Sequence, residues 1–301
     1  MHSDVQLSKG LWGVLATPFR EGGLEFDEAS MRRQVELHHT VGSTGVVALG
    51  VFGESARLTA QERVRVVETV RDAAEGLGLV IGLSELETTS AIAAGRALLE
   101  AAGRPAALMV QVPTAHKEAL TEHLVSVNDA TGAPLVVQDY PVASGVTITT
   151  GELLEAIADL PFIAAVKSEA PPTSRAISEL TAATDVPVFG GLGGLGLLDE
   201  LMAGASGAMT GFSHPEGLAS ALQAWEQGGF PAAREAYAPW LPIVNFEAQA
   251  GIGLAIRKRI LAERGLFDSG AVRPPSPTFP EALLPLLQAH LAHVPSVPEL
   301  H

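Results

Sequence analysis

Short apolar runs alternate with longer amphipathic stretches along this chain, beginning near residue 13. The runs lie at 13–19, 45–50, 79–84, 106–113, 134–141, 162–166, 186–191 and 206–212. Each is rich in β-compatible residues and bounded by turn residues, which is typical of a buried strand. The stretches between them carry apolar residues at helical spacing. The pattern therefore predicts eight strand–helix pairs.

Several predicted helices begin at clear capping residues. Asp27 precedes a helix that we expect to run to His39. Thr59 and Glu62 have the spacing of a capping box, in which each side chain accepts a backbone donor of the other, and Thr149 and Glu152 repeat it. Further helices are predicted at 88–102, 117–131 and 172–184, with a short one ending at 203.

Nearly continuous apolar strands joined by helices indicate parallel strands that are buried on both faces. The predicted fold class is therefore α/β, a (β/α)8 TIM barrel over residues 1–230. An open doubly wound sheet is the alternative, but its usual glycine-rich phosphate loop is absent from ATPFREGG after the first strand. Helical patterns at 232–245, 247–264 and 280–293 predict that residues 231–301 form a C-terminal helical extension on the barrel, with a frayed tail, PSVPELH.

Composition narrows the function. The formal net charge of -15 gives no basic stripe for nucleic acid or an anionic membrane. Absence of cysteine excludes disulfides, thiolate metal sites and cysteine nucleophiles. No apolar run approaches the ~18 residues of a membrane span, and the N-terminus lacks a signal-peptide pattern. We expect a soluble cytoplasmic protein that acts on a small molecule.

One lysine stands out from the other three. Lys167 ends the apolar strand in PFIAAVKSEAPP, whereas Lys9, Lys117 and Lys258 fall in ordinary polar surroundings. An amine between apolar neighbours loses hydration, which favours the neutral form and nucleophilic attack on a carbonyl. The alternative is a lysine that extends to solvent at the strand end. In a barrel, other polar strand ends would surround it at the same edge: Glu54, Ser84, Glu85, Gln111, Gln138, Tyr140 and Thr210.

The motifs resemble those of a known family of class I, pyruvate-type aldolases. They are TPF at 17–19, a GxxGES-x-x-LT-x-x-ER stretch at 50–63, the strand-six lysine, a glycine-rich end of strand seven and VRPP at 272–275. Together they resemble the dihydrodipicolinate synthase and N-acetylneuraminate lyase family over about residues 11–275. The resemblance implies a barrel with added C-terminal helices, an oligomer such as a dimer or tetramer, and Lys167 as the Schiff-base lysine, with no other cofactor and no metal.

The resemblance also implies a substrate site, from which this chain departs at several positions. The turn at Val51 and Phe52 would bind the oxo-acid carboxylate through backbone N–H groups only, because the usual hydroxyls are absent. Gln138 replaces the proton-shuttling tyrosine of strand five, and the tyrosine expected after strand four is missing. Gln138 is then expected to position groups, and proton transfer is left to Tyr140, His116, or a water or substrate carboxylate. Further contacts are expected from Gln111, Gly191 and Met209.

Three functions follow from these residues. The first is a lyase, aldolase or dehydratase, that forms a Schiff base with a pyruvate-like 2-oxo acid. It is not expected to be the lysine-pathway synthase, because residues 142–145 (VASG) stand where that enzyme carries an arginine. Phe52 and Leu192 predict a less polar mouth. The second is a barrel that binds an oxo acid without turnover. A metal-dependent barrel enzyme is disfavoured, because the strand ends lack clustered histidine and carboxylate ligands.

Overall fold

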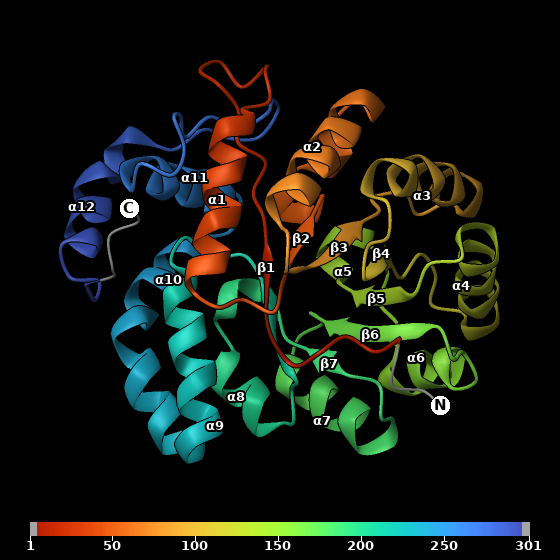
Figure 1. Cartoon of the computed structure of the whole chain (residues 1–301). Coiled ribbons are helices and arrows are strands. Elements are labelled where there is room, and N and C mark those ends of the chain that lie inside the picture. The colour runs from red at the N-terminus through yellow and green to blue at the C-terminus, as the bar shows by residue number, and fades with distance from the viewer. Residues whose placement is uncertain (1–4, 297–301) are drawn as a thin grey trace.

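Eight parallel strands form the centre of the computed structural model, which describes residues 5–296 (Figure 1). The neighbouring strands follow the order β7-β6-β5-β4-β3-β2-β1-β8. Backbone hydrogen bonds close the barrel, from Ser206 N to Val188 O at 2.7 Å and from Met209 N to Gly190 O at 2.9 Å. This closure confirms the predicted barrel over the open sheet. The strands are Gly10–Val14 (β1), Gly45–Ala48 (β2), Gly78–Gly82 (β3), Ala107–Gln111 (β4), Leu135–Asp139 (β5), Ile163–Ser168 (β6), Val188–Phe189 (β7) and Gly207–Thr210 (β8).

The predicted boundary of the first strand was wrong. β1 begins at Gly10 and ends at Val14, whereas the prediction ran from 13 to 19. Residues after Val14 are as apolar as the strand because they pack into the core as a loop, in which Thr17 Oγ1 donates to Gly53 O at 2.7 Å and Phe19 is fully buried. Apolarity thus marked burial but not strand pairing.

The helices that surround the barrel begin where their caps predicted. Asp27 caps the first helix through Ser30 N, and both predicted capping boxes form. A short helix after β5, Pro141–Ser144 (α5), was not predicted. The other helices of the ring are Glu28–Thr40 (α1), Ala60–Ala73 (α2), Thr88–Ala102 (α3), Lys117–Thr131 (α4), Thr150–Ile157 (α6), Thr173–Ala183 (α7) and Leu197–Met202 (α8).

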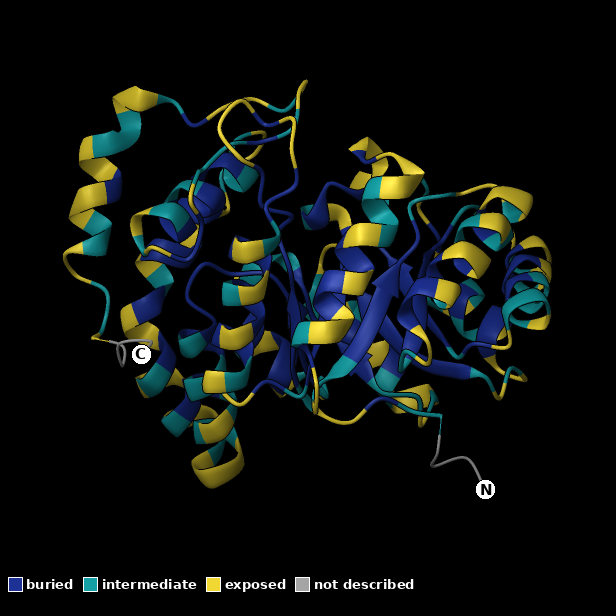
Figure 2. Cartoon of the chain, turned by 45° about the horizontal axis from the view of Figure 1, so that its top comes forward, coloured by how far each residue is buried: buried dark blue, intermediate teal, exposed yellow. Residues whose placement is uncertain are grey.

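Two apolar layers hold the barrel together. The inner layer fills the barrel with side chains such as Trp12, Val47, Met109 and Met209, all of them buried. The outer layer lies between strands and helices and includes Val35, Val70 and Leu124. Figure 2 shows the buried strands at the centre and the exposed outer faces of the helices. Side chains alternate along each strand between these two layers, so both faces of the strands are buried.

The C-terminal helices pack beside β1 and β8 (Figure 1). They are Pro215–Tyr237 (α9), Leu241–Glu247 (α10), Gly253–Glu263 (α11) and Leu284–Leu291 (α12). α9 is kinked at Gly229, whose φ of 63° lies in the left-handed region. The predicted helix at 232–245 is divided between α9 and α10 by a 3-10 turn, Ala238–Trp240, and that at 247–264 begins only at Gly253. Of the frayed tail, all but two residues lie outside the described part of the chain.

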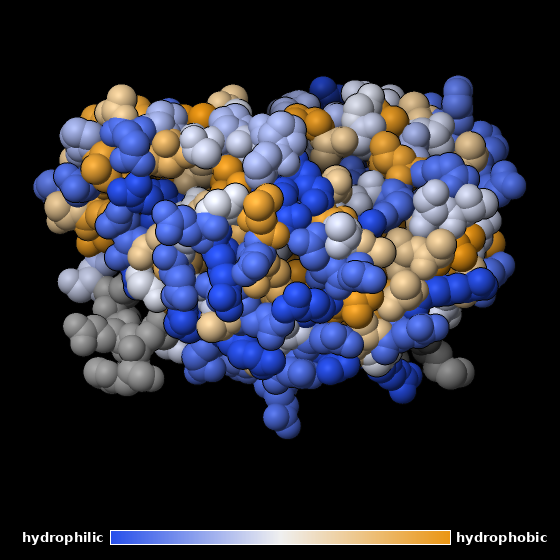
Figure 3. All heavy atoms as spheres, turned by 90° about the horizontal axis from the view of Figure 1, so that it is seen from above, coloured by the Kyte–Doolittle hydropathy of each residue, from blue (hydrophilic) through white to orange (hydrophobic). Residues whose placement is uncertain are grey.

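The outer surface is mixed in polarity. Seen from above in Figure 3, apolar side chains lie in small groups among hydrophilic ones. Among residues 5–296, no helix is both long and apolar enough to cross a membrane.

Candidate functional site

A cavity of about 750 Å³ opens at the carboxyl ends of the strands. One side is lined by strand ends and the loops that follow them, including Phe52, Gln111, Gln138 and Leu192. The rest of the lining comes from the α10–α11 connection and the first turns of α11, up to Arg257, which lies against Phe52. Polar strand ends thus meet at one mouth, and C-terminal helices complete its wall.

Lys167 lies near the carboxyl end of β6, in register with the lining residue Gln138, and 5% of its surface is exposed. Its Nζ lies 3.1 Å from Oε2 of Glu169. The same Oε2 accepts a hydrogen bond of 2.7 Å from Gln138 Nε2, and Oε1 accepts one of 3.1 Å from Leu192 N. Lys167 is not among the lining residues, but Gln138 and Leu192, which hold its partner, are. The amine is buried as predicted, but in an ion pair rather than among apolar and neutral groups alone.

Glu169 is the functional candidate that the sequence reasoning missed. It follows Lys167 by two residues, a spacing that places both side chains on the same face of an extended chain. Its backbone N–H continues the ladder by donating to Asp139 O at 2.8 Å. A Cβ at Gly191 would lie 2.1 Å from Glu169 Oε1, so only glycine fits beside this carboxylate. The i, i+2 spacing and the glycine pair at 190–191 were the signals that could have found it.

Gln138, Gln111 and Tyr140 all line the cavity. Gln138 pairs with Lys167 across the β5–β6 ladder and with Gln111 across β4–β5, so the three side chains lie in one row. Burial and the charge of Glu169 raise the pKa of Tyr140, which makes its hydroxyl a weaker acid. The same two causes raise the pKa of neighbouring Asp139 to about 6.

The other predicted site residues are divided between the cavity and its surroundings. Val51 and Phe52 line the mouth in a short 3-10 turn, Val51–Gly53. Gly191 lies against Glu169, as described above. Met209 is fully buried in the inner layer of the barrel and is not a lining residue. His116 is exposed at the start of α4, outside the lining.

The expectation that Lys258 lies in ordinary polar surroundings was wrong. Lys258 on α11 is fully buried and donates to Glu54 Oε2 and, at 3.1 Å, to Ala271 O. Its Nζ lies 4.2 Å from the centre of the Phe19 ring. Burial lowers the pKa of Lys258 to about 8, against the opposing charge of Glu54. Helical spacing could not reveal this burial, because the partner lies 204 residues away in sequence.

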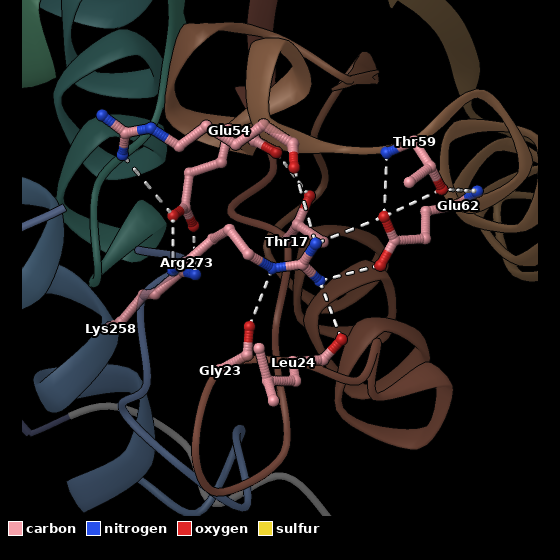
Figure 4. Close-up of polar contacts among 10 residues, drawn as sticks. Thr17, Gly23, Leu24, Glu54, Thr59, Glu62, Lys258 and Arg273 are labelled. Carbon is pink, nitrogen blue, oxygen red and sulfur yellow. Dashed lines mark hydrogen bonds and ion pairs between the residues drawn. The ribbon is translucent and has the colours of Figure 1, made fainter. Parts of the chain in front are cut away.

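Glu54 therefore anchors the turn after β2 to the C-terminal segment (Figure 4). Its Oε1 accepts a hydrogen bond of 2.8 Å from Arg273 N, in the VRPP motif. The Arg273 side chain donates to Gly23 O at 2.8 Å and to Glu62 at 2.8 Å, and this contact lowers the pKa of Glu62 to about 2. The GES motif and the VRPP motif thus contact each other and hold the turn after β2 in place beside the cavity. Among the described residues, no cluster of histidine and carboxylate side chains could hold a metal ion.

Comparison with known proteins gives one consistent result. The model of the dihydrodipicolinate synthetase family matches residues 7–293. L-2-keto-3-deoxyarabonate dehydratase of Azospirillum brasilense is 30% identical over 285 residues, 91% of each chain. 4-Hydroxy-tetrahydrodipicolinate synthase of Kineococcus radiotolerans is 31% identical over 281 residues, covering 91% of this chain and 89% of that one. The crystal structure of dihydrodipicolinate synthase from Rhodopseudomonas palustris has a TM-score of 0.88 at 27% identity and covers 96% of this chain and 99% of that one.

Proposed function

The chain belongs to the dihydrodipicolinate synthetase family, and from this premise we propose that it is a dehydratase of hydroxylated 3-deoxy-2-oxo acids. It is an enzyme of the class I type, in which a lysine forms a Schiff base with the substrate. We assign that lysine as Lys167. The observation that carries the proposal is the buried pair of Lys167 Nζ and Glu169 Oε2 at 3.1 Å, held by two residues of the cavity wall.

The reaction begins at the amine. Lys167 passes a proton to Glu169, and its neutral amine attacks C2 of the oxo acid. Glu169 then returns that proton to the departing C2 hydroxyl, so that water leaves, an iminium ion forms and Glu169 is again a carboxylate. The iminium withdraws electrons from C3, so the proton there becomes acidic. No cofactor is required, because the iminium is the electron sink. We do not assign the proton transfer to Tyr140, because its raised pKa makes it a poor donor.

Glu169 performs the elimination. Its carboxylate removes the C3 proton and returns a proton to the hydroxyl that leaves C4, so one C–H and one C–O bond break and one water forms. A C3–C4 double bond results, and hydrolysis of the imine frees Lys167. Gln138 Nε2 and Leu192 N orient the carboxylate through their hydrogen bonds. Gln138 thus positions the base, which is the role expected for an amide.

Unpaired polar atoms in the cavity wall support a hydroxylated substrate. Gln111 Oε1 and Ser55 Oγ are buried lining groups without a hydrogen-bond partner among the described residues. The Gln111 oxygen accepts hydrogen bonds only, so substrate hydroxyls suit it. The similarity to the A. brasilense protein, named for a 3-deoxy-2-oxo sugar acid, supports the same class.

We propose that the chain is not the lysine-pathway synthase. Val142 and Ala143, which line the cavity in the segment where an arginine is expected, offer no charge for the carboxylate of an aldehyde partner. The buried pair of Lys167 and Glu169 argues against the alternative of a barrel that binds an oxo acid without turnover. We also propose that residues 231–296 form one structural unit with the barrel, because α9 crosses residue 230 and Lys258 pairs with Glu54. A cytoplasmic location and a homo-oligomer, dimer or tetramer, stay our predictions. Analytical ultracentrifugation would measure the oligomeric state.

A substrate panel tests the proposal. The purified enzyme is given 3-deoxy-2-oxo pentonates and hexonates, and separately pyruvate with aspartate semialdehyde. We expect dehydration of at least one sugar acid, seen as the dehydrated oxo acid by mass spectrometry, and no condensation. Condensation with aspartate semialdehyde as the faster reaction would identify a synthase. Binding without turnover of any member would support the binding protein instead.

A further inference from the structure

An arginine of the C-terminal helices lines the cavity with part of its guanidinium unpaired. Arg257 on α11 has 3% of its side chain exposed. Its Nε donates to Glu247 Oε2 at 2.8 Å, but Nη1, also buried, has no hydrogen-bond partner within residues 5–296. A buried charged donor without a partner is unfavourable. Such a group is available to bind a ligand that enters the cavity.

The guanidinium is held rigidly in this position. Its Cζ lies 3.7 Å from the centre of the Phe52 ring, in the turn after β2. Glu247, its ion-pair partner, is itself fixed by hydrogen bonds from Ser213, through N at 3.3 Å and through Oγ. A Cβ at Gly211 would lie 2.7 Å from Nη1, so glycine is required there. An arginine that is stacked, paired and enclosed in this way loses little freedom when it binds a ligand.

The guanidinium also lies close to the proposed reaction centre. Leu192 N binds Glu169, and a Cβ on the next residue, Gly193, would lie 3.3 Å from Arg257 Nη2. The turn at Leu192 and Gly193 therefore contacts Glu169 on one side and lies next to Arg257 on the other. The arginine and the turn that holds the base therefore border the same cavity.

We propose that Arg257 binds the C1 carboxylate of the 2-oxo acid. This inference rests on the proposed function, whose substrate class carries a single anionic group at that position. A guanidinium offers donors in a planar fork that matches a carboxylate. Its charge takes the place of the hydroxyls that are lacking at Val51 and Phe52 in the same wall. Specificity for an acid over a neutral carbonyl compound thus comes from the C-terminal helices.

The test compares pyruvate with methyl pyruvate, which has the same carbonyl but no negative charge. Half-saturation of borohydride trapping is measured for both compounds in the wild type and in Arg257→Gln. We expect the half-saturating pyruvate concentration to rise on the order of 10-fold to 100-fold, the usual value of a charged hydrogen bond. The value for methyl pyruvate should change by less than about 3-fold.

Arg259→Gln is the matched control, because Arg259 lies on the same helix and pairs with Glu263 and Glu281 away from the cavity. It should leave both values unchanged. Equal shifts for the acid and the ester, or no shift for pyruvate, overturn the proposal. If Arg257→Gln does not fold, the double variant Arg257→Met with Glu247→Gln removes both charges of the pair and undergoes the same comparison.

Failure of the proposed function can be distinguished from failure of this inference. If the wild type traps neither compound, Schiff-base chemistry fails, and pyruvate binding is then measured by ligand-observed NMR. Binding that Arg257→Gln weakens still supports the anion site. Pyruvate binding that does not depend on Arg257, or no binding, contradicts it.

Discussion

The chain buries two lysine–glutamate pairs, and they differ in how many of the lysine's donors are used. Lys258 has Glu54, Ala271 O and the Phe19 ring around its Nζ and is fully buried. Lys167 retains a slight exposure, and its one ion-pair partner among the described residues is Glu169. The partner of Lys258 anchors distant segments, whereas the partner of Lys167 is held by the cavity wall. Spare hydrogen-bonding capacity, rather than burial, therefore distinguishes Lys167, the lysine that we propose is reactive, from Lys258, which is fully enclosed.

Lys167→Met is expected to have the largest effect on activity. Removal of the amine removes the covalent step, and we expect a fall in turnover on the order of 10⁴-fold or more. Turnover of the sugar acid and a thermal melt measure it. The fold should persist, because Glu169 keeps its hydrogen bonds from Gln138 and Leu192. If the variant turned over its substrate at nearly the wild-type rate, Lys167 would not be the Schiff-base lysine.

Glu169→Gln tests the partner of the reactive lysine. The amide keeps the size of the side chain but cannot take the C3 proton, so we expect kcat to fall on the order of 10² to 10³-fold. Trapping at saturating pyruvate should still occur but more slowly, since the amine is present and has lost the group that accepts its proton. Glu54→Gln is the matched change in the other pair and should lower the melting temperature while leaving the trapped lysine unchanged. If Glu169→Gln and Glu54→Gln both lost a similar part of kcat without losing stability, the two pairs would not differ in function.

Lys258→Met tests the structural pair. The change leaves Glu54 buried without its cation, which typically costs about 3 to 5 kcal/mol of unfolding free energy. Chemical denaturation measures the loss. The double variant Lys258→Met with Glu54→Gln should recover part of it. A single variant as stable as the wild type would mean that the pair does not anchor the β2 turn.

The smallest expected effect is a pH dependence of stability that comes from Lys258. Burial lowers its pKa to about 8 in the folded protein, below the value of 10.5 for a free lysine. The unfolded chain then binds more protons between these two pH values, so this group's contribution to stability rises as the pH increases from about 8 to 10.5. The difference in unfolding free energy between the wild type and Lys258→Met should follow this slope. If the difference in unfolding free energy did not change between about pH 8 and pH 10.5, the lowered pKa of Lys258 would be contradicted.

The fold was predictable from local pattern, but its long-range ion pairs were not. Hydrophobic periodicity predicted the eight parallel strands, and capping residues predicted where α1, α2 and α6 begin. Both signals lie within a few neighbouring residues of the sequence. The end of β1 was missed, since a buried loop and a buried strand are equally apolar. The burial of Lys258 depends on a partner more than two hundred residues away, and no local pattern contains that contact.

The candidate site was predictable only in part. Lys167 stood out because a single charge in an apolar strand is unusual, and Gln138 followed from its position in the preceding strand. Glu169 was missed although its spacing from Lys167 was visible, because it lies beyond the predicted end of the sixth strand at residue 166, whereas β6 extends to Ser168. Arg257 was missed because α11 reaches the mouth only through tertiary packing.

The central claim is that the amine of Lys167, and not that of Lys258, forms the imine. Wild-type protein is treated with pyruvate and borohydride, digested and mapped by mass spectrometry. We predict a single reduced pyruvate adduct on the peptide that contains Lys167. An adduct on Lys258, or no adduct at saturating pyruvate, would contradict the account.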